Sequence, residues 1–430
     1  MIQDCKNTID EFYKELTVRA RENGHPEFAE QFQRSYADTL EKTVVRNVDG
    51  TVHVITGDIP AMWLRDSAAQ IRPYLYLADR DEELQEIIGG LVRRQFFYIN
   101  IDPYANAFNN EPSGACWEKD YPDQNPWIWE RKYEVDSLCY PIQLAWLLWK
   151  NTGYTKHLDE NFHKGVRRIL EVFKTEQNHE NLSDYRFVRK GSYFTDTLSR
   201  DGKGALVCPN TGLIWSGFRP SDDACTYGYL IPSNMFAVVV LGYLGELAEK
   251  VLNDRELEAD AISLRDEVHQ AIEKYGRTRV EEFGEVYAYE VDGYGMYHLM
   301  DDANVPSLLA MKYLGYPADE QVAENTRKLI LSEMNPYYYT GKAASGIGSP
   351  HTPSRYIWHI ALAMQGLTAD TKEEKEQILK LMLETTGGKG MMHEGFHADD
   401  PGKYTREWFS WANAMYCELY LDYMGYKIIV

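Results

Sequence analysis

The segments VDSLCYPIQLAWLLWKN (135–151) and KHLDENFHKGVRRILEVFKTEQ (156–177) are separated only by TGYT (152–155), and together they show the unit from which this chain is built. Apolar residues recur in both segments with the 3.6-residue period of an α-helix. The connection between them is short and polar. The two segments therefore predict a hairpin of two helices joined by a tight turn.

The same pattern recurs along the chain. Further helix pairs are predicted at 67–79 with 82–101, 233–251 with 255–276, 302–314 with 318–334, and 354–367 with 371–386. Additional helices are predicted at 5–23, 28–46 and 408–424, and short strands at Tyr185–Val188 and Val286–Tyr289. Long connections rich in Trp, Tyr, Asp, Asn, Pro and Gly separate the pairs, at 102–134, 178–232, 277–301, 335–353 and 387–407. Long loops in a compact protein are usually functional.

This alternation predicts an all-α fold of the (α/α)6 toroid type, in which helical hairpins close into a ring. The short turns would lie on one face, and the long loops, with a few short strands, would surround a mouth on the other. No low-complexity or Pro/Gly/Ser-rich linker divides the 430 residues, so we expect a single catalytic domain over 1–430. The hydrophobic fraction of 44% is ample for a large core.

The formal charge of -21 excludes the strongly basic surfaces that nucleic acids and anionic membranes select. No apolar stretch is long enough for a membrane span, and the start at Met1 lacks the pattern of a signal peptide, so we expect a cytoplasmic protein. The six cysteines are scattered singly, which indicates neither a disulfide framework nor a zinc site. The partner should be small or neutral.

The stretch DIPAMWLRDSAAQIRPY (58–74) offers groups that suit a sugar. Trp63 presents an apolar face for a pyranose ring, while Arg65 and Asp66 offer a five-donor fork and a carboxylate for its hydroxyls. Asp66 or Ser67 is placed to cap the helix that follows. A purely architectural ion pair beside a helix cap is the alternative interpretation.

A second motif, NTGLIWSGFRPSDDACTYGYLIPSN (210–234), ends a long loop just before a predicted helix. Two adjacent carboxylates, Asp222 and Asp223, cannot both be ionised in an apolar cleft without cost. One of them is therefore expected to have the raised pKa of a general acid. The alternative is that both aspartates belong to a solvated turn, where Asp is common.

The loop GGKGMMHEGFHADDPGKYTREWFSWAN (387–413) presents Glu394 between a histidine and a glycine. His393-Glu-Gly-Phe-His397 has the spacing of a zinc-binding His-Glu-x-x-His motif. That motif needs a helix to point both imidazoles one way, and the surrounding glycines disfavour a helix. A loop carboxylate without a metal is the preferred interpretation, and we expect no cofactor.

Three segments together carry a family resemblance: 58–73, SGFRPSDD (216–223) and HEGFH (393–397). In this order they resemble the exo-α-1,6-mannosidases of glycoside hydrolase family 125, and the resemblance covers essentially the whole chain. It implies an (α/α)6 fold and hydrolysis of non-reducing terminal α-1,6-linked mannose with inversion, by an Asp acid and a Glu base, without a metal. Carried over by motif, the acid is Asp222, with Asp223 as the fallback, and the base is Glu394.

An inverting mechanism agrees with this assignment, because it needs two carboxyl groups about 6.5–9.5 Å apart with a water beside the base. We expect the neighbouring Asp223 and aromatics such as Trp215 to raise the pKa of Asp222. We expect Glu394 to stay ionised near His393 or Arg406. The residues predicted to hold the terminal sugar are Trp63, Arg65, Asp66, Trp127, Asp136, Asn304 and His351. Asp136 and Asn304 could equally be helix caps.

Other functions remain open at the level of sequence. A sugar isomerase or epimerase of the same fold could use paired histidines among His351, His359, His393 and His397, although two opposed carboxylates favour hydrolysis. An exo-glycosidase acting on another α-hexoside has the same requirements. A carbohydrate-binding protein without turnover would not need a glutamate on a glycine-rich loop.

Overall fold

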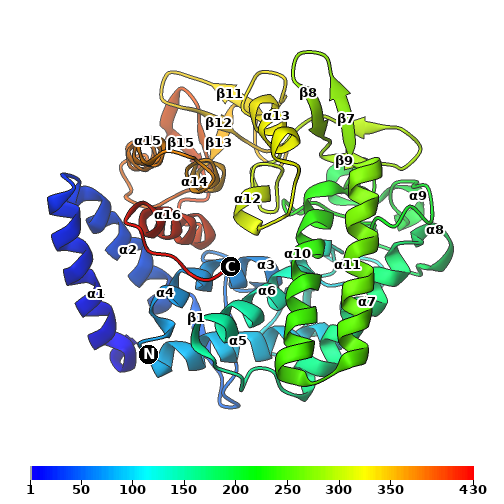
Figure 1. Ribbon diagram of the computed structural model, residues 1–430, viewed down its shortest axis with the longest axis horizontal. Helices are drawn as coiled ribbons and strands as arrows, with labels where there is room; N and C mark the ends of the chain where they lie inside the picture. The colour runs from blue at the N-terminus through cyan, green and yellow to red at the C-terminus, as the bar shows by residue number, and fades with distance from the viewer. Residues whose placement is uncertain (1) are drawn as a thin grey trace.

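The computed structural model describes residues 2–430, and most of its regular structure is helical (Figure 1). The α-helices are α1 (Ile2–Glu22), α2 (Pro26–Lys42), α3 (Leu64–Ile71), α4 (Leu75–Ala78), α5 (Glu82–Ile101), α6 (Val135–Thr152), α7 (Glu160–Glu176), α8 (His179–Leu182), α9 (Ser199–Gly202), α10 (Ile231–Leu247), α11 (Arg255–Tyr275), α12 (Met311–Leu314), α13 (Glu320–Ile330), α14 (His359–Leu367), α15 (Lys372–Glu384) and α16 (Ser410–Tyr423). The 3-10 helices η1 (Arg72–Tyr74) and η2 (Phe194–Asp196) and the π-helical turn η3 (Ala248–Leu252) complete this set.

The strands are short and form small antiparallel sheets. These are β1 (Val44–Arg46) with β2 (Val52–Val54); β3 (Met62–Trp63), β4 (Ala107–Phe108) and β5 (Ile128–Glu130); β6 (Tyr229–Leu230), β9 (Glu290–Val291) and β10 (Tyr297–His298); β7 (Arg277–Val280) with β8 (Gly284–Tyr287); β11 (Tyr338–Thr340) with β12 (Ser345–Ile347); and β13 (Tyr356–Trp358), β14 (Gly395–His397) and β15 (Asp400–Thr405). Three of these sheets position candidate site residues.

An inner set of helices surrounds the centre of the ring, and an outer set covers it (Figure 1). Helix α3 packs on α6, α6 on α10 and α10 on α12, while α14 packs on α16 and α16 on α3. Helices α10 and α16 are buried over almost their whole length, as expected for elements covered on all sides. The outer helix α7 instead buries one stripe, which includes Phe162, Val166, Ile169 and Phe173.

The helical toroid predicted from the sequence is confirmed, but several helix limits differ. The predicted helix at 28–46 ends at Lys42, because the following residues pair as β1 with β2. The predicted helix at 67–79 begins earlier, at Leu64, and changes to 3-10 geometry at Arg72–Tyr74. Trp63 is its N-cap residue without a side-chain bond, so the predicted cap by Asp66 or Ser67 is wrong.

Two further predicted helices, at 302–314 and 354–367, are shorter in the structure than predicted. Over 302–314 only Met311–Leu314 is helical, because the carboxylate of Asp301 takes the backbone N–H groups of Leu308 and Leu309. The helix predicted at 354–367 begins at His359, since the preceding residues form β13 against β14.

Of the predicted strands, Val286–Tyr289 corresponds to β8 at Gly284–Tyr287. The prediction at Tyr185–Val188 is wrong, since the segment contributes only a bridge from Val188 to Tyr121.

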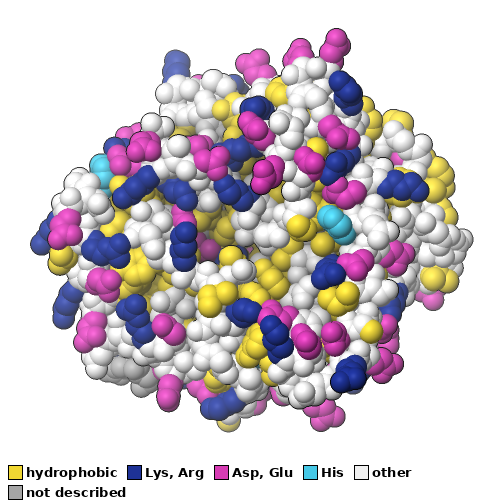
Figure 2. All heavy atoms as spheres, viewed as in Figure 1, with side chains coloured by type: hydrophobic (Ala, Val, Ile, Leu, Met, Phe, Trp, Pro, Cys, Tyr) yellow, Lys and Arg dark blue, Asp and Glu magenta, His cyan; other side chains and the backbone are white. Residues whose placement is uncertain are grey.

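Acidic and basic side chains are interspersed over the face seen in Figure 2, so neither sign covers that face alone. Such a mixed surface does not offer the continuous basic patch that nucleic acids require. Among the helices described between residues 2 and 430, none is both long enough and apolar enough to cross a membrane.

Candidate active site

Four of the five long connections meet at one cavity of about 420 Å³. The connection 102–134 contributes Trp117, Glu130 and Lys132; 178–232 contributes Arg189, Tyr193, Thr195, Asp196 and Pro220–Asp223; 335–353 contributes Pro350 and His351; and 387–407 contributes Glu394 and Arg406. Trp63, Trp358, Phe409 and Trp411 give it aromatic walls, while Thr56, Ile59, Arg65, Asp66 and Asn304 complete the lining. The volume and the mixture of rings and carboxylates suit a small polar ligand with apolar faces.

A tight turn presents Asp222 to the cavity. The backbone N–H of Asp222 donates to Arg219 O at 2.9 Å, and that of Arg219 donates to Asp223 O at 2.8 Å. Asp222 adopts a left-handed conformation with φ of 67°, which is uncommon for a residue with a side chain. Glu290 in β9 holds the base of the turn by accepting from Arg219 Nε at 2.6 Å. A strained residue at a cavity wall, fixed by a buried ion pair, is typical of a functional position.

Arg65 lies at the centre of four carboxylates. Its Nη1 donates to Glu134 Oε2 at 2.6 Å and to Asp136 Oδ2 at 3.1 Å, and its Nη2 donates to Asp222 Oδ1 at 3.2 Å. Asp66 Oδ2 lies 3.5 Å from Nε. One buried guanidinium cannot neutralise four carboxylates, and this surplus of negative charge favours the protonated form of some of the carboxyl groups. We call these five residues the Arg65 cluster.

The pKa values within the Arg65 cluster diverge. Burial raises the pKa of Asp66 to about 6, and burial raises those of Glu134 and Asp136 as well, against the opposing charge of Arg65. Burial also acts on Asp222, but the charges of Arg65 and Lys132 outweigh it and hold its pKa well below the usual range. The expectation that Asp222 itself has a raised pKa is therefore wrong. The neighbouring Glu134 is instead the group whose pKa is raised, chiefly by burial.

Asp223 points to a different partner. Its Oδ1 lies 3.1 Å from His351 Nδ1, and hydrogen bonding to Asp223 helps raise the pKa of His351 to about 9, although desolvation of the ring in the cavity acts to lower it. The carboxylates of Glu394 and Asp222 act in the same direction. Asp223 therefore forms an ion pair with His351 and does not raise the pKa of Asp222 as predicted. The side chains of the two adjacent aspartates thus face different partners, Arg65 and His351.

Glu394 immediately precedes β14, the middle strand of a three-stranded sheet. The backbone N–H of His393 donates to His359 Nδ1 at 3.0 Å, which fixes the chain just before the glutamate. Arg406 Nη1 lies 3.6 Å from Glu394 Oε1, and Arg406 Nε donates to Asp58 Oδ2 at 3.0 Å. Asp58 thus orients the arginine that faces the candidate base.

The zinc interpretation of His393-Glu-Gly-Phe-His397 does not fit this geometry. The motif runs into a strand, so its imidazoles are not placed on one helix face. Both ring nitrogens of His393 lie 2.9 Å from backbone carbonyls, those of Glu407 and Thr386, and the ring stacks on Tyr404. His393 is therefore part of the support of the loop.

The structure brings most of the predicted sugar-holding residues together, because Trp63, Arg65, Asp66, Asn304 and His351 all line the cavity with Asp222 and Glu394. Two others lie elsewhere. Trp127 is not among the described residues that line the cavity, and it packs on Phe97 with the Arg94 guanidinium 5.2 Å from its ring centroid. Asp136 is buried behind Arg65, where it also accepts from Ser233 Oγ at 3.2 Å. It supports the cavity without lining it.

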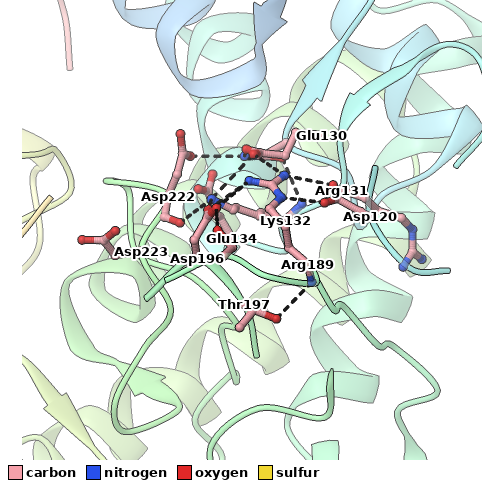
Figure 3. Close-up of polar contacts among 12 residues, drawn as sticks. Asp120, Glu130, Arg131, Lys132, Glu134, Arg189, Asp196, Thr197, Asp222 and Asp223 are labelled. Carbon is pink, nitrogen blue, oxygen red and sulfur yellow. Dashed lines mark hydrogen bonds and ion pairs between the residues drawn. The ribbon is translucent and has the colours of Figure 1, made fainter. Parts of the chain in front are cut away.

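Sequence reasoning missed a second buried ionic group. Arg189 binds Asp120 with its Nε at 2.7 Å and Asp196 with its Nη1 at 3.0 Å, while its Nη2 donates to Glu130 at 2.9 Å (Figure 3). Lys132 Nζ donates to Asp196 Oδ1 at 2.6 Å and to the backbone oxygen of Asp222 at 2.8 Å. We call Arg189, Lys132, Asp120, Glu130 and Asp196 the Arg189 cluster. The alternating charges of WERKYEVD (129–136) are the one signal that could have indicated it.

The cavity can bind a pyranose between aromatic walls and place carboxylates from two different loops beside it. Asp222 and Glu394 have side chains that are 23% and 10% exposed, enough to reach a ligand in the cavity. Carboxyl groups with opposite protonation needs and an aromatic pocket are the requirements of glycoside hydrolysis. A structure of a bacterial glucoamylase bound to acarbose superposes with a TM-score of 0.59 over 98% of this chain and 59% of that chain, and at 14% identity it indicates the fold alone. The fold and the cavity define a glycoside hydrolase of the helical-toroid class.

The chain belongs to glycoside hydrolase family 125, described as metal-independent α-mannosidases, which it matches over residues 25–421. A metal-independent α-mannosidase from Streptococcus pneumoniae, solved in a non-productive complex with α-1,6-mannobiose, is 52% identical. It superposes with a TM-score of 0.95 over 98% of this chain and 99% of that one. The meiotically up-regulated gene 157 protein of Schizosaccharomyces pombe is 38% identical over 424 residues, which is 93% of this chain and 83% of that protein.

Proposed function

We propose that this α-mannosidase removes the non-reducing terminal mannose from α-1,6-linked mannosides with inversion at the anomeric carbon. The observation that carries the proposal is the cavity in which Asp222 and Glu394, from two different loops, meet between aromatic walls. The α-1,6-mannobiose bound by the 52% identical relative supports the choice of linkage.

In this proposal Asp222 is the general acid and Glu394 the general base. Arg406, held by Asp58, lies 3.6 Å from Glu394 Oε1 and orients the carboxylate that would activate a water molecule. In this proposal Glu134, whose pKa is raised chiefly by burial, holds the proton before the sugar binds, and both carboxyl groups share Arg65 as a partner. A sugar that fills the cavity excludes water around Asp222, which raises its pKa. The proton then moves to Asp222 and from there to the glycosidic oxygen, and the leaving group departs as an alcohol.

The isomerase alternative has less support in the geometry. Of the histidines that it would use, His359 and His393 are fully buried, and His359 bonds the His393 backbone. Only His351 lies in the described cavity lining, so a facing histidine pair is not assembled there. Hydrolysis by two carboxyl groups remains the function that the site supports.

Proton NMR of the anomeric signals during turnover of α-1,6-mannobiose tests the proposal. We expect β-mannose to appear first and α-mannose to follow by mutarotation, because inversion of an α-mannoside gives the β-anomer. Initial release of α-mannose would disprove inversion. An inert α-1,6-disaccharide, alongside active cleavage of an α-1,2- or α-1,3-linked one, would overturn the linkage. A run after exhaustive chelation should give the same rate.

A further inference from the structure

Three large aromatic side chains stand exposed at the mouth of the cavity. Trp117 is 62% exposed, Tyr193 is 84% exposed and Phe194 is 87% exposed. Trp117 and Tyr193 line the same cavity as the candidate catalytic carboxylates. Phe194 lies between Tyr193 and Thr195 in the sequence, and Thr195 and Asp196 also line the cavity. Leaving rings of this size in water forgoes the stabilisation that their burial would give. Their position indicates a ligand surface continuous with the cavity.

The two segments that carry these rings are joined firmly to one another. Tyr121 and Val188 exchange two backbone hydrogen bonds of 2.9 Å, which pairs the Trp117 segment with the chain leading to Tyr193. Arg189 grips Asp120 on the first segment and Asp196 on the second, with its own side chain only 2% exposed. The three rings are therefore exposed groups on a firmly connected base.

The same base is connected to the candidate acid. Lys132 Nζ contacts the carboxylate of Asp196 at 2.6 Å and the backbone oxygen of Asp222 at 2.8 Å (Figure 3). Ala224, two residues after Asp222, donates its backbone N–H to Thr195 O at 2.7 Å. The aromatic surface therefore has a set position relative to the bond that would be cleaved.

We propose that Trp117, Tyr193 and Phe194 form an aromatic rim that binds the leaving-group side of a longer neutral oligosaccharide, beyond the sugar next to the scissile bond. This inference rests on the proposed function, since an enzyme that removes a terminal sugar must let the rest of the chain leave through the mouth. Pyranose rings present apolar faces that stack on aromatic side chains, and the three rings add no charge. The occupant is thus the substrate's own glycan chain.

The test compares substrates that differ only in the length of the leaving group. Initial mannose release is measured with α-1,6-mannobiose, α-1,6-mannotriose and α-1,6-mannotetraose, for the wild type and for a variant with Trp117→Ala, Tyr193→Ala and Phe194→Ala together. The matched control is Tyr294→Ala, because Tyr294 is 61% exposed and is not among the described residues lining the cavity. All four positions are exposed, so the variants should fold.

We expect the wild-type kcat/KM to rise roughly three- to tenfold from the disaccharide to the longer chains, as the burial of one or two ring faces would give. The triple variant should lose this rise, and Tyr294→Ala should keep it. Equal kcat/KM for all lengths in the wild type, or an unchanged rise in the triple variant, would overturn the rim while leaving the proposed function intact. Loss of the rise in Tyr294→Ala would also overturn it. Failure to release mannose from every length would instead reject the proposed function, and the rim with it.

Discussion

The two buried ionic clusters beside the cavity differ in their balance of charge. In the Arg65 cluster one guanidinium faces four carboxylates, whereas in the Arg189 cluster two cations face three (Figure 3). The pKa values follow this balance. Burial raises the pKa of Asp66, Glu134 and Asp136 in the first cluster. In the second, the charge of Lys132 overcomes burial and lowers the pKa of Asp196.

This difference in charge balance suits the two clusters to different roles, one in catalysis and the other in structural support. A cluster with surplus carboxyl groups favours the protonated form of some of them, which a general acid needs. A cluster whose charges nearly cancel instead holds chain segments in place through its ion pairs. The first therefore suits bond cleavage at Asp222, and the second suits the positioning of the loops around it.

The sharpest test of this division is a matched pair of substitutions. Asp222→Asn should lower kcat/KM on α-1,6-mannobiose by roughly 10²–10⁴-fold, the range typical of a lost acid or base, and Glu394→Gln should do the same. Asp196→Asn, in the Arg189 cluster, should cost less than about tenfold, since it weakens support alone. The measurement is mannose release by the three folded variants and the wild type at one pH. Full activity of Asp222→Asn with an inactive Asp223→Asn would move the acid by one position.

Removing the central cation of the second cluster should act on stability. Arg189→Met leaves Asp120 and Glu130 buried without their main partner, so we expect the free energy of unfolding to fall by about 3–5 kcal/mol. Urea unfolding followed by circular dichroism measures this loss, with Arg355→Met as a control that should change little, because the Arg355 side chain is 42% exposed. A wild-type unfolding curve for Arg189→Met would show that the cluster does not hold the loops.

Glu134→Gln tests whether the first cluster stores the proton. The amide keeps the shape and a hydrogen bond but cannot release a proton to Asp222. We therefore expect kcat to fall roughly tenfold at neutral pH and the alkaline limb of the pH profile to move about one unit lower. A pH–rate profile for both proteins measures it. An unshifted alkaline limb, even with lower kcat, would limit Glu134 to a steric role.

The smallest expected effect concerns His351. Its pKa of about 9 in the folded protein exceeds the ordinary value of 6.5, so its ion pair with Asp223 contributes stability that is fully present below pH 6.5 and is lost as the pH rises through 9. Comparing urea midpoints of the wild type and His351→Gln at pH 6 and pH 9.5 measures this. The difference between the two proteins should shrink at the higher pH. A difference that grows with pH would contradict the pairing.

The alternation of helical hairpins with long loops was enough to predict the toroid, because the 3.6-residue period is a local property of the sequence. The same reasoning failed at 302–314, where Asp301 takes backbone donors that a helix would have used. It also failed at the start of α14, where three residues pair with a strand almost forty positions away. Neither a side chain that accepts backbone N–H groups nor a pairing with a distant strand changes the hydrophobic period of the sequence.

For the candidate site, the sequence identified the motifs that supply the cavity: Trp63, Arg65 and Asp66 at one wall, the Asp222–Asp223 pair, and Glu394 on its glycine-rich loop. Those residue types carry their chemistry with them. Only the tertiary structure decided which charges meet. Trp127 lies outside the cavity lining, and Asp136 lies behind Arg65. Asp223 pairs with His351. Arg189 binds both segments that carry the aromatic rim, through Asp120 and Asp196. A pKa or an ion pair depends on distance and burial in space, and these are fixed only when the ring of helices closes.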